Sequence, residues 1–271
     1  MIRTLQPNAV IFGPYADIRW VGNEEGVAGD PCWATYDPAP AVMTDIQASD
    51  GGRKEELMSG QVNGTRWQPA ECDVSIRPGW FWHENENSKV KTPEQLLDLY
   101  FDSVGRGGSM LLNVPPNREG RLQAADAASI AAFHQNLKKM FAVDLAQTAK
   151  LRASNIRFGA ARFGPHQLLD HAPSTYWATD DAVLSGDITI DFRTAQRITV
   201  VRLREMIALG QRIRAFALDA WQGSEWKEMA TATSIGSCRL IRFQTPVVTS
   251  KLRLRIVRSD AAIALAQLSV F

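Results

Sequence analysis

The pattern of apolar residues changes near residue 150, and this change limits the chain to folds with two unlike parts. Before it, the runs NAVIFGP (8–14), CDVSI (72–76) and SMLLNVPP (109–116) are largely apolar, and each ends at a turn or a proline. Such runs are typical of strands that are buried on both faces. After it, DITIDF (187–192) and KLRLRIVR (251–258) alternate apolar with polar residues. That alternation predicts a β-sandwich or jelly roll whose sheets each have one solvated face.

Two helices are predicted in the first part. Thr92 lies just before Pro93 and three residues before Gln95, which is the arrangement of a capping box with proline at the first position. It predicts a helix from Pro93 to about Gly105. A second helix is expected over about 123–141, where apolar residues recur at spacings of three and four. Strands that alternate with helices indicate a parallel α/β architecture, and residues 37–66 are expected to form a long polar loop.

Charge also separates the two parts. Residues 1–150 hold 14 basic and 19 acidic residues (net −5), and residues 151–271 hold 16 and 10 (net +6), for a total of +1. This balance gives no case for a nucleic-acid partner. The cysteines Cys32, Cys72 and Cys238 match no metal-ligand spacing, and we expect neither a metal nor a cofactor. No run approaches 18 apolar residues and the first residues lack a signal-peptide core, so we expect no membrane partner.

The stretch RWVGNEEG (19–26) places two glutamates between an asparagine and a glycine. Alone, such a pair is usually a solvated turn. Here, however, five of the eight tryptophans lie within residues 1–82, interleaved with acidic residues. Aromatic rings beside carboxylates suit a sugar, whose C–H face packs on a ring while its hydroxyls bond to acceptors. Glycoside cleavage also needs two carboxyl groups, and in a parallel barrel these lie on loops after strands, as Glu24 is expected to do.

Three long motifs now carry a family resemblance: QPNAVIFGPYADIRWVGNEEG, WQPAECDVSIRPGWFWH and SVGRGGSMLLNVPPNREG. In this order, over about residues 5–142, they resemble the second half of the catalytic barrel of glycoside hydrolase family 29, the α-L-fucosidases. The resemblance is strongest to the subgroup that acts on α-1,3/1,4-linked fucose. Residues 151–271, with LLDHAPSTYWAT and GQRIRAFALDAW, resemble the discoidin-like (factor 5/8 type C) sandwich that often follows this catalytic domain.

The resemblance implies a role for several residues. It places the general acid/base at Glu24, so that Glu25 is the ordinary turn glutamate. Trp80 matches the aromatic residue that packs on the fucose ring. Glu71, Asp73 and Arg77 are candidates for binding fucose or the neighbouring sugar; the alternative for these three is an ion pair that holds the strand end. His83 is a weaker candidate, and Asn113 and Pro115 are expected to shape the last strand and its loop.

The sequence also departs from the family pattern. The family nucleophile is an aspartate in a segment like Trp-Phe-Asp-Gly on an earlier strand, and no such segment is present. A (β/α)8 barrel needs about 250 residues, whereas about 140 are present here. We therefore expect residues 1–142 to form an α/β half-barrel, the second half of a TIM-like barrel. Residues 143–150 would be a linker and residues 151–271 an all-β, galactose-binding-like sandwich.

Two functions remain open. In the first, the chain belongs to a retaining α-L-fucosidase that acts on fucosylated oligosaccharides, and a missing N-terminal half-barrel supplies the nucleophile. The isolated chain would then be inactive. In the second, the half-barrel is a non-catalytic remnant, and the sandwich binds carbohydrate or has a structural role. Sugar binding by the sandwich is expected at the loops near Asp170–Asp180. The family resemblance implies a periplasmic or extracellular location for a full-length member.

Overall fold

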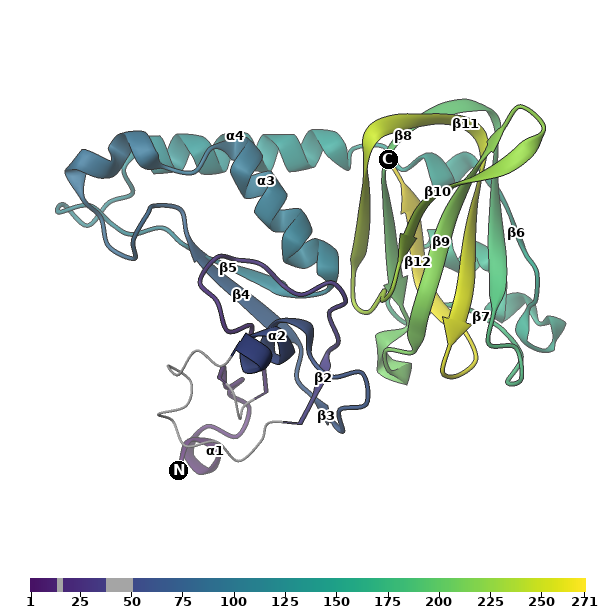
Figure 1. The fold of residues 1–271 in the computed structure, drawn as a ribbon, viewed down its shortest axis with the longest axis horizontal. Coiled ribbons are helices and arrows are strands. Elements are labelled where there is room, and N and C mark those ends of the chain that lie inside the picture. Colours follow the sequence, from purple (N-terminus) through teal and green to yellow (C-terminus); the bar gives the residue numbers. More distant parts are fainter. Residues whose placement is uncertain (14–16, 38–50) are drawn as a thin grey trace. The chain divides into compact units, whose positions relative to one another are not determined.

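The computed structural model describes residues 1–13, 17–37 and 51–271, together with the backbone but not the side chains of 51–53. The chain forms two compact units, Met1–His134 and Gln135–Phe271, and the boundary falls within helix α4 (Ala124–Met140) (Figure 1). No helix in the described ranges is long and apolar enough to cross a membrane. No group of three or more His, Cys, Asp or Glu side chains in those ranges is placed to hold a metal ion.

The first unit is built on a parallel sheet with the strand order β1 (Arg19–Trp20), β4 (Ala70–Ser75), β5 (Ser109–Asn113). Trp20 lies opposite Glu71, which in turn lies opposite Ser109. Because directly paired residues share a face, these three side chains lie on one side of the sheet. On the other side, Ala70 and Cys72 join Val21, Ala28 and Cys32 in a small apolar core. The sheet therefore has one packed face and one partly polar face.

Two strands and two helices of this unit confirm predictions from the sequence. The run at 72–76 overlaps β4, and the run at 109–116 contains β5. Helix α3 (Pro93–Asp102) begins at the predicted capping box, in which the Thr92 side chain accepts from the backbone N–H of Gln95. Helix α4 (Ala124–Met140) matches the helix expected at 123–141, and its Phe133 is buried.

Two other predictions for this unit are wrong. The run at 8–14 makes only one bridge, between Phe12 and Ile18, while Val10 and Phe12 remain 69% and 45% exposed. No strand among the described residues pairs with this run, so it does not become part of a sheet and its apolar side chains are not buried by one. The region 37–66 is not all loop. Part of it, 38–50, lies outside the described residues, but Gly51–Ser59 form helix α2, and β3 (Arg66–Trp67) pairs with β2 (Thr35–Tyr36). A short helix α1 (Ile2–Leu5) precedes them.

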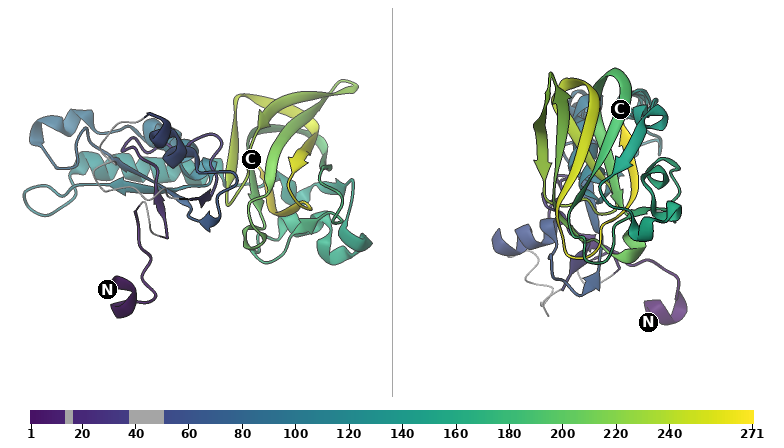
Figure 2. Two further views of the ribbon diagram at one scale, coloured as in Figure 1. Left: turned by 60° about the horizontal axis from the view of Figure 1, so that its bottom comes forward. Right: turned by 90° about the vertical axis from the view of Figure 1, so that its right-hand side faces the viewer.

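The second unit is mostly sheet. Its strand order is β10 (Glu225–Ala232), β9 (Ile213–Gln222), β11 (Arg239–Ser259), β8 (Gly186–Glu205), β12 (Ala264–Val270), β7 (Trp177–Ala178), with β6 (Lys150–Ala153) also paired to β8. Strands β8 and β11 are 20 and 21 residues long, and their pairing register shifts twice. Figure 2 shows in its right-hand view that the strands of this unit face one another in two layers.

A single apolar core fills this unit. Trp177, Ile188, Leu203 and Leu254 are among its members, and each has no exposed surface. Ala146 belongs to the same core, and the N–H of Val270 donates to Asp144 Oδ1 at 2.9 Å. The residues expected as a linker, 143–150, therefore contribute directly to the packing of the second unit.

The alternation at 251–258 places its basic residues on the outer side of the sheet, away from that core. Arg253 and Arg255 both donate to Asp219 Oδ2, at 2.8 and 2.6 Å. The Arg253 guanidinium also lies over the Trp226 ring, 4.6 Å from its centroid. These contacts favour the prediction that the basic residues line an outer strand face and do not form a ligand patch.

Candidate active site

The loop after β1 is shaped by Asn23 and two glycines. The Asn23 side chain is 5% exposed; its Nδ2 donates to the carbonyl of Val27 at 2.9 Å, and its Oδ1 accepts from the N–H of Glu25 at 3.0 Å. Gly22 and Gly26 have φ values of 76° and 78°, in the left-handed region that favours glycine. At Gly26 a Cβ atom would lie 2.9 Å from Val74 Cβ. The loop is therefore held against β4 while the Glu24 side chain stays exposed.

Glu24 and Trp80 meet although they are 56 residues apart. The indole Nε1–H of Trp80 donates to Glu24 Oε2 at 2.6 Å. Trp80 follows the end of β4, and Glu24 follows the end of β1, which is parallel to it. Both loops therefore lie at the carboxyl ends of neighbouring strands, where the residues of active sites in parallel α/β folds gather. The structure thus brings together the predicted acid/base and the predicted aromatic platform.

A second pair of the same kind lies beside the first. The indole N–H of Trp20 donates to Asp73 Oδ1 at 2.6 Å. Burial raises the pKa of the Asp73 carboxyl above its ordinary value; the Trp20 hydrogen bond works against this rise, and the negative charge of Glu24 adds to it. Asp73 and Glu24 are therefore close enough for their charges to interact. Asp73 was a candidate from the sequence, but its hydrogen bond to Trp20 was not predicted. The two residues are 53 positions apart, and no local pattern signals the contact.

Glu71 lies on the same face of β4 as Asp73, two residues earlier. Its Oε2 accepts from the Ser109 hydroxyl at 3.3 Å, across to β5. On this face Trp20, Glu71 and Ser109 lie side by side on the three neighbouring strands. Asp73 lies two residues further along β4, opposite Leu111. The role of Glu71 in binding sugar stays a prediction, and its position on the polar face is compatible with it.

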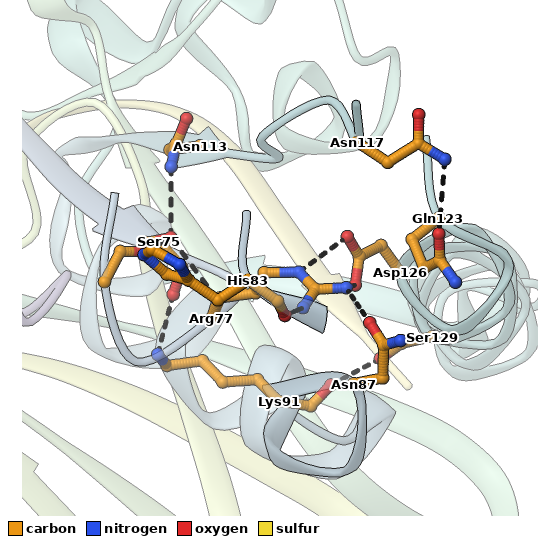
Figure 3. Close-up of polar contacts among 11 residues, drawn as sticks. Ser75, Arg77, His83, Asn87, Lys91, Asn113, Asn117, Gln123, Asp126 and Ser129 are labelled. Carbon is orange, nitrogen blue, oxygen red and sulfur yellow. Dashed lines mark hydrogen bonds and ion pairs between the residues drawn. The ribbon is translucent and has the colours of Figure 1, made fainter. Parts of the chain in front are cut away.

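Arg77 lies in a different environment (Figure 3). Its guanidinium donates from Nε to Asp126 Oδ2 at 3.0 Å and from Nη2 to Asn87 Oδ1 at 2.9 Å, and the Arg77 and Asp126 side chains have no exposed surface. For Arg77 the sequence left two possibilities, sugar binding and an ion pair that holds the strand end. These contacts favour the ion pair.

The backbone that carries Trp80 is held by the same network. Asn113 Nδ2 donates to the carbonyl of Trp80 at 3.0 Å and to the Ser75 hydroxyl, also at 3.0 Å. Ser75 in turn donates to the carbonyl of Gly79 at 2.7 Å. Asn113 thus shapes the strand end, as expected, and it also fixes the loop that places Trp80 against Glu24. His83, the weaker candidate, has an exposed side chain.

Chemically, this arrangement offers an exposed carboxyl that is held by one indole donor, beside a second carboxyl whose pKa is raised by burial. An exposed carboxyl in a polar setting can donate or accept a proton, and an aromatic ring beside it can pack on the apolar side of a sugar.

Comparison with known proteins agrees with this geometry. The family model for α-L-fucosidase matches residues 20–140, and the model for the F5/8 type C domain matches residues 150–267. Alpha-L-fucosidase 1 of Arabidopsis thaliana is 37% identical over 97% of this chain and 52% of its own length. The chain therefore spans about half the length of this relative.

Solved structures give the same result. A Bacteroides thetaiotaomicron protein assigned as an α-L-fucosidase superposes with a TM-score of 0.91 at 35% identity, covering 100% of this chain and 59% of that one. A GH29 fucosidase of Ruminococcus gnavus, in complex with fucose, gives a TM-score of 0.85 at 30% identity over 97% of this chain and 52% of its own. Over residues 20–140 the chain belongs to the α-L-fucosidase family, GH29, and residues 150–267 are an F5/8 type C domain.

Proposed function

We propose that the chain forms part of a retaining α-L-fucosidase, with Glu24 as its general acid/base. The observation that carries this proposal is the hydrogen bond from Trp80 Nε1 to Glu24 Oε2 at the carboxyl ends of β1 and β4. It places an exposed carboxyl, which cleavage of a glycosidic bond requires, beside an aromatic side chain that can pack on the sugar. The substrate is a fucosylated oligosaccharide, and the linkage preference we infer is α-1,3/1,4.

In the proposed reaction, Glu24 protonates the glycosidic oxygen as the bond to the anomeric carbon breaks. A carboxylate about 5–5.5 Å away attacks that carbon and forms a fucosyl-enzyme intermediate. Glu24, now ionised, takes a proton from water, which displaces the enzyme carboxylate and releases fucose. Trp80 packs on the sugar, and its N–H holds Glu24 in place.

Asp73 is a poor candidate for the attacking carboxylate. A nucleophile must be ionised and have a free oxygen, whereas burial raises the pKa of Asp73 and so works against its ionised form, and Trp20 already donates to its Oδ1. We propose instead that the nucleophile comes from a segment outside this chain. Asp73 and Glu71 would then bind sugar hydroxyls.

The sheet supports a half-barrel as the setting of this site. The outer edges of β1 and β5 have no strand partner among the described residues. On the polar face, Leu111 is 51% exposed, although it lies in the middle of β5. In a closed barrel this face would line the filled interior. We therefore propose that residues 1–142 are the second half of a (β/α)8 barrel, followed by a joint at 143–150 and a sandwich at 151–271.

Hydrolysis of an aryl α-L-fucoside by the purified chain tests the placement of the nucleophile. We expect a rate no higher than that of Glu24→Gln, because one of the two required carboxyl groups is absent. Asp73→Asn serves as the matched variant. A rate that both Glu24→Gln and Asp73→Asn abolish would make Asp73 the nucleophile and contradict this part of the proposal.

The second unit supports an additional role in binding carbohydrate. A pocket of about 220 Å³ is lined by His171, Ala172 and Pro173, within the 170–180 region named from the sequence, together with Arg204 and Gln267. The His171 ring contacts the amide groups of Gln147 and Gln267. Titration of monosaccharides against the chain and against Arg204→Ala tests this role, and equal affinity for both would exclude this pocket.

A further inference from the structure

Two tryptophan–carboxylate pairs connect β1 and β4 in opposite directions. In the first pair, Trp20 of β1 donates from its indole Nε1 to Asp73 Oδ1 of β4 at 2.6 Å. In the second pair, Trp80 follows β4 and donates to Oε2 of Glu24, which follows β1, also at 2.6 Å. The function proposed above gives a role to Trp80, Glu24 and Asp73, and it leaves Trp20 without one.

The strand that carries Trp20 is anchored by the preceding residue, Arg19. Arg19 lies opposite Ala70, which belongs to the packed face of the sheet, so its side chain lies on the side away from the Trp20 ring. The Arg19 side chain is buried, and its guanidinium donates to three carbonyl groups: those of Leu57 at 2.8 Å, Gln68 at 2.7 Å and Trp33 at 3.0 Å. These bonds join β1 to three separate segments. Trp20 is therefore held on a strand that is fixed from its other face.

The hydrogen bond from Trp20 affects both the charge and the orientation of Asp73. Burial raises the pKa of the half-buried Asp73 carboxyl, and the Trp20 hydrogen bond lowers it, because a donor favours the ionised carboxylate. The same bond fixes Oδ1. Among the described residues no second side chain donates to Asp73, so Oδ2 keeps its capacity to accept from a ligand hydroxyl.

The two pairs also keep two carboxyl groups near each other. The negative charge of Glu24 acts on Asp73, so the two groups lie within electrostatic range. Like charges repel, and side chains that carry them separate unless they are held. The indole N–H of Trp20 brings a partial positive charge to Asp73, and that of Trp80 brings one to Glu24. Each carboxyl of the pair is thus held by its own donor from the neighbouring strand or loop.

We propose that Trp20 is a positioning residue of this site. It holds Asp73 by one oxygen on the polar face of the sheet, and it leaves the other oxygen as a fixed acceptor for a hydroxyl of the sugar bound at Glu24. Trp20 acts through Asp73 and does not contact the sugar itself. The inference rests on the proposed function for the identity of the ligand, whereas the effect of Trp20 on Asp73 is independent of it.

Titration of the Asp73 carboxyl carbon by NMR in the full chain tests the first step of this proposal. Asp73→Ala assigns the signal. Trp20→Phe keeps an aromatic ring in place and removes the donor, so the midpoint of the Asp73 titration should rise in that variant. Trp226→Phe, on β10 of the second unit, is the matched control and should leave the midpoint unchanged. If the Trp20 ring only packed, Trp20→Phe would leave it unchanged as well.

Binding of L-fucose to the full chain tests whether Trp20 acts through Asp73. The indole N–H signal of Trp80, assigned with Trp80→Phe, reports the binding, because this group bonds to Glu24. Trp20→Phe and Asp73→Ala should each weaken binding, by about tenfold for the loss of one hydrogen bond. The double variant should bind no more weakly than Asp73→Ala alone, because Trp20 has nothing to position once the carboxylate is gone. Trp226→Phe should bind as the original chain does.

The results separate the positioning role from the proposed function. An unchanged Asp73 midpoint in Trp20→Phe, or losses of fucose affinity that add in the double variant, would overturn the role of Trp20. If fucose still shifts the Trp80 signal in that case, the proposed function survives. If instead fucose leaves the Trp80 signal unmoved while the Asp73 midpoint rises in Trp20→Phe, the fucose position is wrong and Trp20 positions Asp73 for a different ligand.

Discussion

At the scale of single residues, the Glu205 carboxylate holds three backbone segments of the second unit together. Oε1 accepts from the N–H groups of Arg212 and Ile213 at 2.7 and 3.0 Å, and Oε2 accepts from Gly236 at 2.7 Å. The residue is 3% exposed. Burial raises the pKa of Glu205 to about 7, against the lowering effect of these three hydrogen bonds.

This raised pKa predicts a pH dependence of stability. The folded unit binds the proton more tightly than the unfolded chain, so the stabilisation is fully present below about pH 4.5 and is lost as the pH rises through about 7. A shift of this size corresponds to about 3 kcal/mol. Calorimetry of the full chain at pH 5 and pH 8 should show the second-unit transition at a lower temperature at pH 8.

Glu205→Gln should remove most of this pH dependence and lower stability at both pH values. Its amide can still accept from Arg212 and Ile213, but its NH2 group would face the N–H of Gly236, and an unpaired buried donor costs about 1–3 kcal/mol. Glu225→Gln, on the exposed edge strand β10, is the control. An unchanged pH dependence in Glu205→Gln would show that another group titrates.

Glu24 could be chosen from the sequence because the motif that contains it is a short continuous stretch. The side chains that surround it could not be predicted, because they come from distant parts of the chain. Trp20–Asp73 and Trp80–Glu24 each join two loops or strands, and the register of β1 against β4 decides which side chains meet. A parallel pairing across about 50 residues leaves no periodic signal in the sequence. The same is true of Asn113, whose contact with the Trp80 carbonyl depends on the register of β5.

At the scale of elements, the ion pair between Arg77 and Asp126 connects the end of β4 to the first turn of α4. Asp126→Asn should destabilise the first unit by about 3–5 kcal/mol, because it leaves a buried guanidinium without its counter-charge. Glu119→Gln is the matched control; the Glu119–Arg121 pair is exposed and should contribute nothing measurable. Thermal denaturation of the full chain measures both variants.

A second readout separates this effect from the site. Since Arg77 also holds the His83 carbonyl, Asp126→Asn should shift the indole signal of Trp82 at temperatures where the chain is still folded. Glu119→Gln should not. If Asp126→Asn lowers the melting temperature and leaves Trp82 unmoved, the ion pair stabilises the fold without positioning the loop.

The elements that could be predicted are those with a local signal of their own. Helix α3 begins at its capping box, and apolar and polar residues alternate in the stretches 187–192 of β8 and 251–256 of β11. The run at 8–14 has the composition of a buried strand, but composition does not supply a neighbouring strand. Helix α2 was missed because its Gly-Gly start and polar sequence are typical of a loop, although its Leu57 is buried and accepts a hydrogen bond from Arg19.

At the scale of the whole molecule, the two units should differ in how well they fold alone. The core of the second unit is a single cluster that includes Ala146, so residues 143–271 should unfold cooperatively, and at a higher temperature than residues 151–271. Residues 1–142 have a three-stranded sheet whose two edges have no strand partner in the part of the chain that the structure describes, and they should aggregate. Calorimetry of the three fragments tests this. A sharp, reversible transition for residues 1–142 would contradict the half-barrel.

The central claim is that Glu24 is the acid/base of a fucosidase site whose nucleophile lies outside this chain. The most direct test joins the chain to the preceding barrel half of the Bacteroides thetaiotaomicron relative and measures aryl α-L-fucoside hydrolysis. The hybrid should be active, and Glu24→Gln should lower its rate by about 10²–10⁴-fold. Azide should restore turnover in that variant and yield α-L-fucosyl azide, because azide needs no general base to attack the fucosyl-enzyme. An active hybrid that is insensitive to Glu24→Gln would contradict the account.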